Sequence, residues 1–473
     1  MSKKKKKRGF RLILLSLLFL PALEVLFIIG CNSDYLIRRP YLFIIAALIV
    51  IFTILLIRGV LLYTKNKKAS RRKLRKWIKV VLSFIIAVYI LGCSIFVGIL
   101  YGPSEKFKTW LITTAMNTMD HQYLCKWFYS KNDIEEVLNR NFVKESGAST
   151  DKSLITKKKR KTYLDEYDKE ILDVEEGRKY KIIQLEVDGQ KAYLAAIYDP
   201  SMIRLQVTKT LGKKGQYVSH MAEDTQAILA INGGGFREDG QLTLGGAPNG
   251  ITISDHKVLS NGEYGYNGTG GLIGFTDDGI LMLLKNKTAQ EALDMGIRDA
   301  VSWGPFLIVN GESSQVGGSG GWGFGARTAI GQREDGIVLF LVVDSNAQRT
   351  RGADMSDLLE IMERYHAVNA ANLDGGTSSV MVLPKTGGLY DDDPTPVCQE
   401  TADNVARYAC PINDPIDSTW KHRTRYIADA WVVVDNGGGF NVDSNDTTNK
   451  EEKTTKTEKK QSSTKKSTKK GKN

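Results

Sequence analysis

Three long apolar runs within about the first hundred residues restrict the possible folds of this chain more than any other feature of its sequence. They cover about 12–29, 41–63 and 80–101. A helix needs about 20 apolar residues to cross the hydrocarbon core of a bilayer, and each run comes close to this length or reaches it. We therefore expect a membrane region at 1–103 with three transmembrane helices.

Basic segments beside these runs set the expected orientation. Residues 3–8 and 65–76 are rich in Lys and Arg, and short basic loops stay in the cytoplasm. With both segments inside, the chain after about Tyr101 lies outside the cell. The sequence thus predicts a multi-pass cell-membrane protein that contacts lipid through three helices and has an extracellular C-terminal domain. For the first run, a cleaved signal peptide and lipid attachment at Cys31 remain alternatives.

The net charge of +12 is located at the two ends of the chain. Residues 1–77 contribute +16 and the Lys-rich tail 450–473 contributes +7, so the middle carries −11. A nucleic-acid-binding domain is expected to be basic. The charge distribution therefore argues against a nucleic-acid partner.

Residue composition and apolar patterning divide the rest of the chain into three parts. Residues 104–179 have a helical pattern followed by a polar stretch, and we expect a juxtamembrane helical spacer and linker. Residues 441–473 are rich in Lys, Thr and Ser and cannot bury apolar surface, so we expect a disordered tail. Between them, 180–440 alternates short apolar runs with Gly, Asn and Asp turns. This pattern predicts an α/β domain with a strand-rich mixed sheet and few helices.

Two cysteines of the C-terminal domain enclose a loop rich in Pro and Asp. Disulfides persist outside the cell, and we expect one between Cys398 and Cys410, with two unpaired thiols as the alternative. Their spacing fits neither a redox pair nor a complete zinc site.

Within the domain, a strand–helix–strand unit places two aspartates at strand ends. The apolar strand Ile337–Val343 ends at Asp344, and the strand Val368–Leu373 ends at Asp374. A helix between them fits a crossover that leaves the two strands parallel. Both aspartates would then lie at one edge of the sheet, about 5–10 Å apart if one strand or none separates them. That range covers the carboxylate separations of glycosidases, whereas an Asp after a strand also commonly caps a turn.

Gly-rich segments and one arginine surround this unit. Asn232-Gly233-Gly234-Gly235-Phe236 follows an apolar strand, and two further Gly-rich segments follow it. Glycine lets backbone amides approach an anion closely, although strand-rich folds also use it in turns. Arg327 can bind a phosphate through two parallel hydrogen bonds, or form a structural ion pair.

Five motifs in this order resemble the phosphodiester glycosidase family over about 180–435. They are Asn232-Gly-Gly-Gly-Phe, Trp303-Gly-Pro-Phe, Arg327-Thr-Ala-Ile-Gly, Gly352-Ala-Asp and Asn372-Leu-Asp-Gly-Gly-Thr-Ser-Ser. The resemblance implies hydrolysis of a sugar-1-phosphodiester. It implies catalytic roles for Asp374, Asp344 and Arg327. The implied substrate contacts are Asn232, Gly233, Gly234, Gly304, Asn372, Gly375, Gly376 and Thr377.

This chemistry suits the residue types present. A phosphate leaving group is a weak base, so the reaction needs a cation on the phosphate and a carboxylate facing the anomeric carbon. No metal motif stands out, so we expect no cofactor, although carboxylates beside a phosphate are also able to hold a divalent ion. The sequence lacks the nucleophile elbow of triad hydrolases and the phosphate loop of P-loop enzymes.

Together these patterns predict a membrane-anchored bacterial cell-surface hydrolase. Its expected substrates are sugar-phosphate polymers of the envelope, such as teichoic acid or phosphorylated exopolysaccharide. The alternative is a non-catalytic protein that binds cell-wall glycans or assists exopolysaccharide assembly. The carboxylates together with Arg327 favour the enzyme, because a binding protein does not need a carboxylate pair.

Overall fold

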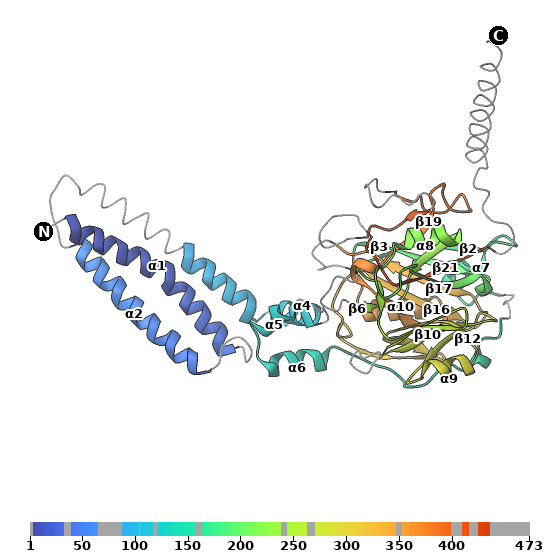
Figure 1. Cartoon of the computed structure of the whole chain (residues 1–473), viewed down its shortest axis with the longest axis horizontal. Coiled ribbons are helices and arrows are strands. Elements are labelled where there is room, and N and C mark those ends of the chain that lie inside the picture. Colours follow the sequence, from blue (N-terminus) through green and yellow to red (C-terminus); the bar gives the residue numbers. More distant parts are fainter. Residues whose placement is uncertain are drawn as a thin grey trace, which may run out of the picture.

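A computed structural model describes residues 3–32, 39–64, 88–103, 105–116, 122–157, 162–237, 244–262, 270–346, 352–398, 409–415 and 424–435. Helices form the N-terminal part, and strands dominate after about residue 180, as the sequence predicts. Short helices lie between the two parts (Figure 1). The predicted disordered tail, 441–473, lies outside the described residues.

The apolar runs form helices, but only one of the described helices is long and apolar enough to cross a membrane by itself. Helix α1 (Lys3–Asn32) contains the stretch Lys7–Asn32, which meets both conditions. Helix α2 (Arg39–Thr64) contains a shorter apolar stretch, Ile44–Gly59, and runs beside α1 (Figure 1). An apolar helix near the N-terminus is compatible with a membrane anchor or with a signal sequence.

The third apolar run is described only in part. Residues Val88–Tyr101 are helical and meet α4 (Glu105–Met116) at an angle of 74°. Residues 80–87 and the basic segment 65–76 lie outside the described residues. Three transmembrane helices are therefore not confirmed. The described helix ends just before Gly102 and Pro103, because a proline cannot continue a helix without losing a backbone hydrogen bond.

Three short helices form the spacer. Helix α4 packs with α5 (Tyr123–Lys126) and α6 (Lys131–Arg140) around a small apolar core that includes Ile112 and Tyr129. The Tyr129 hydroxyl donates a hydrogen bond of 2.9 Å to the carbonyl of Leu100, which fixes the spacer to the end of the third apolar helix. The helical pattern predicted before residue 141 is therefore present as a packed unit.

A seven-stranded sheet forms one layer of the C-terminal domain. Its neighbouring strands all pair antiparallel, and one of them, β16, lies between β17 and β18. In spatial order the strands are β14 (Glu312–Ser313), β13 (Phe306–Val309), β18 (Ala367–Asn372), β16 (Arg327–Arg333), β17 (Val338–Val343), β3 (Gln190–Ile197) and β2 (Tyr180–Val187).

Two five-stranded sheets and two short strand pairs complete the β-structure. One sheet has the order β20 (Ala409–Pro411), β19 (Met381–Pro384), β5 (Leu229–Asn232), β21 (Asp429–Val433) and β4 (Ile203–Val207). The other has the order β11 (Leu281–Leu284), β10 (Gly271–Thr276), β12 (Ile297–Trp303), β8 (Ile251–Ser254) and β9 (Lys257–Asn261). The short pairs are β1 (Phe142–Lys144) with β15 (Gln315–Gly317), and β6 (Phe236–Arg237) with β7 (Ala247–Pro248).

The layers enclose a continuous core. One face of the seven-stranded sheet packs against both five-stranded sheets, with Phe340, Trp431 and Phe275 fully buried between them. Helices cover the outer faces because each has an apolar stripe to bury. They are α7 (Glu166–Leu172) and α10 (Met355–Arg364) on the seven-stranded sheet, α8 (Val218–Thr225) on the β5 sheet and α9 (Ala289–Asp294) on the β10 sheet.

The sequence predicts the strands better than their pairing. The predicted strands Ile337–Val343 and Val368–Leu373 correspond to β17 and β18, and the helix predicted between them is α10, capped by Asp354. The expectation of a mixed sheet is wrong for the described strands, whose ladders are all antiparallel. The reason is that β16 inserts between β17 and β18, which are parallel to each other but not hydrogen-bonded together.

The segment predicted as an exposed linker contributes directly to the domain. Strand β1 pairs with β15, and the Glu145 carboxylate accepts hydrogen bonds of 2.6 and 2.7 Å from the amides of Gly270 and Phe306. The Thr150 amide donates to Leu283 O over 3.1 Å. Residues 158–161 of this segment lie outside the described residues. A fragment starting at residue 180 would lack all these contacts.

The predicted disulfide between Cys398 and Cys410 is present. It joins the residue after Val397 to strand β20, whose partner β19 lies next to β5. The bond closes a loop with a sequence separation of 12 residues. A closed loop of this length restricts the unfolded chain and stabilises the fold by about 3 kcal/mol.

Removing this disulfide should lower the free energy of unfolding by about 3 kcal/mol. We expect the double variant Cys398→Ser, Cys410→Ser to unfold at a lower urea concentration than the wild type, with Cys31→Ser as control because Cys31 is an exposed free thiol. Equal urea midpoints for the double variant and the wild type would show that the bond does not stabilise the domain.

Candidate functional site

Three candidate residues lie at one edge of the seven-stranded sheet. Arg327 pairs with Val343, the residue before Asp344, and Ala329 pairs with Asn372, two residues before Asp374. The start of β16 therefore lies between the ends of β17 and β18. The prediction that both strands end at the same edge, with at most one strand between them, is confirmed. Two strand spacings correspond to about 10 Å between their backbones.

Asp374 occupies the centre of this edge. Its amide donates to Gly233 O over 3.2 Å, and its carbonyl accepts a hydrogen bond of 2.7 Å from Asn232 Nδ2, so the backbone of Asp374 joins the two sheets. The residue is half-buried. Burial raises the pKa of the Asp374 carboxyl, and the Ser378 hydroxyl and the guanidinium groups of Arg425 and Arg327 act in the opposite direction. The carboxyl group thus lies where two cations act on it.

Backbone carbonyls hold the Arg327 guanidinium. Its Nη2 donates to Trp322 O and Gly323 O over 2.7 and 2.6 Å, and its Nε donates to Ala353 O over 3.2 Å. Its Nη1 lies beside Gly375, since a Cβ added there would be only 3.2 Å away. These carbonyl oxygens fix the plane of the guanidinium group. The charge of Arg327 also lowers the pKa of the Asp354 carboxyl, but burial raises this pKa by more.

Arg425 is a second cation that the sequence analysis missed. Its Nη1 donates a hydrogen bond of 3.1 Å to Thr377 Oγ1, and its guanidinium carbon lies 4.5 Å from the centre of the Phe236 ring. Phe236 ends the Asn232-Gly-Gly-Gly-Phe motif, and Thr377 belongs to the motif that contains Asp374. Arg425 therefore links two of the predicted motifs. No local signal in the sequence distinguishes it from the other basic residues at 421–425.

The Asn232 motif builds the floor of the site. Asn232 Oδ1 accepts from the Thr328 hydroxyl over 2.7 Å and from the Val380 amide over 3.2 Å, so its side chain positions Asp374 from inside the protein. Glycine is required at two positions by close contacts. A Cβ on Gly233 would lie 2.2 Å from Asp429 Oδ1, and one on Gly235 would lie 1.9 Å from the Trp303 ring.

Several predicted substrate contacts have internal partners in this structure. The Gly234 amide donates to Asp429 Oδ1 over 2.8 Å, and the Gly376 amide donates to Ala326 O over 2.7 Å. Asn372 Nδ2 donates to Gly304 O over 2.8 Å. These residues shape the edge of the sheet, and their direct contact with a substrate stays a prediction.

Asp344 lies at the same edge, but its carboxylate binds a neighbouring loop. Asn413 Nδ2 donates to Asp344 Oδ1 over 2.8 Å, and the Asp414 amide donates to Oδ2 over 3.0 Å. The residue is 5% exposed, and burial raises the pKa of its carboxyl. This arrangement anchors the loop after β20. The structure therefore does not place the Asp344 carboxylate as an open partner of Asp374.

Asp429 is a second residue that the sequence analysis missed. It starts β21 beside the Gly233 loop and is 1% exposed. Burial, and next the charge of Asp374, raise the pKa of its carboxyl to about 7. Its position depends on the pairing of β21 with β5, which lies about 200 residues earlier in the chain.

Known proteins match the part of the chain that contains this site. Residues 225–434 match the family model for phosphodiester glycosidases. N-acetylglucosamine-1-phosphodiester alpha-N-acetylglucosaminidase from Bos taurus is 28% identical over 198 residues, which are 38% of this chain and 36% of that protein. The SPbeta prophage-derived uncharacterized protein YomE of Bacillus subtilis is 27% identical over 167 residues, which are 34% of this chain and 25% of YomE.

The resemblance to the phosphodiester glycosidase family is confirmed. The matches span about a quarter to a third of the length of these relatives. Among solved structures, the catalytic domain of zebrafish N-acetylglucosamine-1-phosphodiester alpha-N-acetylglucosaminidase is similar, with 20% identity, a TM-score of 0.39, and coverage of 54% of this chain and 82% of that one.

The region that matches the family model contains the charged residues of the candidate site. Arg327, Asp344, Asp374, Arg425 and Asp429 all lie within 225–434. Among the described residues, no group of three or more His, Cys, Asp or Glu side chains is arranged to hold a metal ion.

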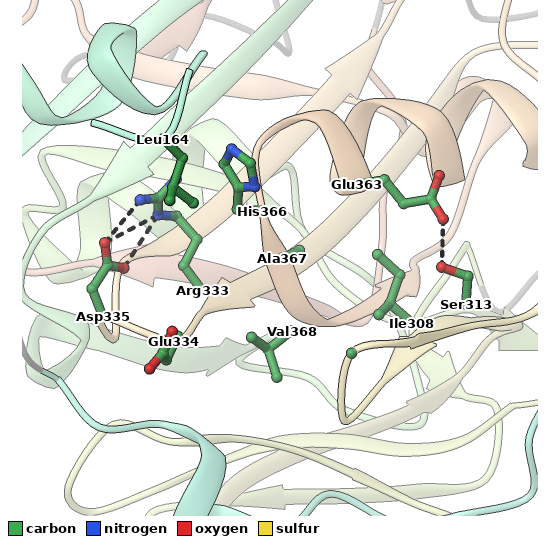
Figure 2. Close-up of a pocket in the computed structure, with 11 residues that line it drawn as sticks. Leu164, Ile308, Ser313, Arg333, Glu334, Asp335, Glu363, His366, Ala367 and Val368 are labelled. Atoms are coloured by element: carbon green, nitrogen blue, oxygen red, sulfur yellow. Dashed lines mark hydrogen bonds and ion pairs between the residues drawn. The ribbon is translucent and has the colours of Figure 1, made fainter. Parts of the chain in front are cut away.

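A pocket of about 430 Å³ lies at the opposite end of β16 from the candidate site (Figure 2). Arg333, at the end of β16, donates to Asp335 and to the buried Asp168, over 2.9 and 2.5 Å. Glu363 accepts a hydrogen bond from Ser313 in the same pocket (Figure 2). Its lining includes none of the predicted site residues, and its arginine is already paired with two carboxylates. The predicted motifs meet at the other end of β16, where the guanidinium groups of Arg327 and Arg425 both act on the Asp374 carboxyl. This placement favours the Asp374 edge as the candidate site.

The spacer supports the site from outside the matched region. Asn141 Oδ1 accepts hydrogen bonds of 3.1 and 3.2 Å from the amide and hydroxyl of Ser319. A Cβ on Gly323 would lie 2.8 Å from Thr114 Oγ1 of α4. The Gly-rich segment 317–325 provides two carbonyls that hold Arg327, so the spacer packs directly against the backbone that positions this arginine.

Asn141→Ala should loosen this segment and lower the thermal stability of the domain. The change leaves the buried amide and hydroxyl of Ser319 without their acceptor, which costs about 1–3 kcal/mol. We expect a lower melting temperature in a thermal shift assay, together with faster backbone hydrogen exchange in 317–325. Asn139→Ala, at an exposed position of helix α6, is the control and should leave both the melting temperature and the exchange of 317–325 nearly unchanged. Unchanged exchange in 317–325 would show that Asn141 does not restrain the segment.

Proposed function

We propose that this chain is a hydrolase that cleaves glycosyl phosphodiester bonds at the Asp374 edge of the sheet. The observation that carries the proposal is the joint placement of one half-buried carboxyl group, Asp374, with two guanidinium groups, Arg327 and Arg425. The sequence match to phosphodiester glycosidases over the same residues supports this chemistry.

The residues have distinct parts in the proposed reaction. Arg327 and Arg425 would attract the phosphodiester and stabilise the charge that develops on the departing phosphate. Asp374 would face the anomeric carbon, where a carboxylate stabilises a positive centre or takes up a proton from water. Asn232 would act by positioning Asp374. The products would be a free sugar and a phosphomonoester.

The proposed substrates are sugar-phosphate polymers of a bacterial envelope, including teichoic acid and phosphorylated exopolysaccharide. The proposal adds a membrane anchor, formed by α1 and the following apolar runs, and an extracellular catalytic domain. A helix of suitable length in α1 and the basic segments 3–8 and 65–76 support this topology. A reporter fused after Lys76 should lie inside the cell and one fused after Asp435 outside. Protection of the domain from protease in intact, wall-stripped cells would overturn the orientation.

The activity test uses the full-length chain in detergent, because residues 141–157 form part of the domain. The purified protein is incubated with UDP-GlcNAc and a panel of sugar-1-phosphodiesters, and free sugar is measured. Release of sugar that requires Asp374 supports the proposal. Saturable binding of these compounds without release of sugar would favour the alternative, a glycan-binding or assembly protein.

A further inference from the structure

Asp429 lies directly against the loop that supports Asp374. Its Oδ1 accepts the 2.8 Å hydrogen bond from the Gly234 amide, and its carbonyl accepts a hydrogen bond of 3.1 Å from the Gly233 amide. The carboxyl group fills the space that a side chain at position 233 would need, since a Cβ there would be 2.2 Å from Oδ1. The absent side chain of Gly233 therefore makes room for this carboxyl group.

The same loop connects Asp429 to Asp374. Gly233 donates its amide to Asp429 O and accepts the Asp374 amide on its own carbonyl, so a single residue separates the two backbones. Asp429 Oδ2 is buried and has no hydrogen-bond partner among the described residues. A buried carboxylate with an unpaired oxygen is costly, whereas the protonated form avoids most of that cost.

Among the described residues, no cation lowers the pKa of Asp429. Burial raises it, the charge of Asp374 raises it further, and only the Gly234 amide lowers it. The strands on either side of β21 present uncharged residues here, with Val207 of β4 opposite Asp429 and Asn232 of β5 opposite Ala430. Arg425 and Arg327 act on Asp374 instead, where they favour the ionised form.

We propose that Asp429 and Asp374 form a carboxyl pair that holds one proton at mildly acidic to near-neutral pH, with the proton on Asp429 and the negative charge on Asp374. The catalytic part of this inference rests on the proposed function. When the oxygen of water bonds to the anomeric carbon, the bond from that carbon to the phosphate oxygen breaks, and its electron pair leaves with the phosphate. Asp374 takes the proton released by the water. Asp429 stays neutral and does not contact the reacting atoms. Its role is to keep the negative charge of the pair on Asp374.

The proposed pair predicts a specific change in the pH profile of kcat/KM. When Asp429 ionises, a second negative charge appears beside the site, repels the phosphodiester and lowers turnover. Asp429→Asn keeps an oxygen for the Gly234 amide and cannot ionise. We expect its rate at alkaline pH to persist, so that the alkaline limb of kcat/KM moves up by at least one pH unit. The acid limb, which reports protonation of Asp374, should stay in place.

The control is Asp393→Asn, because burial also raises the pKa of Asp393, while its carboxylate binds Tyr180 and Tyr390. This variant should leave both limbs in place. If Asp429→Asn also leaves the alkaline limb in place while the wild type turns over substrate, Asp429 is only a structural anchor and the pair is refuted. That result would leave the proposed function intact.

A second measurement does not depend on activity. The folded pKa of Asp429, about 7, lies above its ordinary value of 3.8. As pH rises between these values, the unfolded chain releases a proton that the folded chain keeps, so stability falls. The melting temperature of the wild type should therefore fall relative to that of Asp429→Asn from about pH 5 to about pH 8. Parallel melting curves for the two proteins across this range would contradict a protonated Asp429, whether or not any substrate is found.

Discussion

Asp374→Asn should lower turnover at least about 100-fold, the lower end of what a positioned acid–base group contributes. Asparagine keeps the shape of the side chain and its capacity for hydrogen bonds, but it removes the negative charge between Arg327 and Arg425. That charge is what would stabilise a positive anomeric centre or accept a proton from water. Initial rates of sugar release from the best sugar-1-phosphodiester of the panel measure the effect.

The same variant should keep its thermal stability. Burial raises the pKa of Asp374, so the charged form is costly in the folded state, and a neutral replacement removes that cost at neutral pH. The backbone bonds to Gly233 and Asn232 remain. Asp278→Asn, the same change in a turn after β10, is the control and should keep wild-type rates. Normal hydrolysis by Asp374→Asn would remove this residue from the mechanism, and unfolding would show that it mainly supports the Gly-Gly turn.

The edge that contains Asp374 could be predicted because its strands have a simple pattern. Ile337–Val343 is wholly apolar, and Val368–Leu373 has four apolar residues and two asparagines. Each is followed by an aspartate before polar or Gly-rich residues. Buried strands with a helical crossover must run in the same direction if they belong to one sheet. The shared edge followed from these two facts, and the structure confirms it.

The insertion of β16 between these strands could not be predicted as easily. Its sequence, Arg327–Arg333, contains two arginines and a glutamine, yet the whole strand is buried. Gln332 is fully buried because its amide bonds Gly279 O and Gly336 O, and its oxygen accepts the Leu281 amide. Polar residues that find partners inside a core hide the apolar pattern on which strand prediction depends.

Long-range pairing explains why Arg425 and Asp429 were missed. Both come from the last strand of the domain or the residues just before it, and they reach the site because β21 pairs with β5. Glycine patterns were misleading in a related way. The repeated glycines indicate that something approaches the backbone closely, but the close neighbours of Gly233 and Gly235 are Asp429 and Trp303. A sequence pattern identifies such positions without identifying the group that comes near.

Arg327→Lys should lower kcat/KM almost as much as Arg327→Ala, with both at least about 100-fold below the wild type. A planar guanidinium donates to three carbonyls through Nε and Nη2 while its Nη1 stays beside Gly375. A lysine ammonium is a single point of charge on a flexible chain and cannot occupy these positions together. Binding of inorganic phosphate as a competitive inhibitor should weaken in both variants, because the cation no longer lies in a fixed place.

The matched control is Arg333→Lys, which changes the other end of the same strand. Arg333 is also buried, but its partners are Asp168 and Asp335, far along β16 from Asp374. It should lose thermal stability, since two buried ion pairs are disturbed, and keep its turnover per folded molecule. The Arg327 variants should lose turnover per folded molecule as well. A folded Arg327→Lys protein with near wild-type rate and phosphate inhibition would reduce Arg327 to a support for the 317–325 segment.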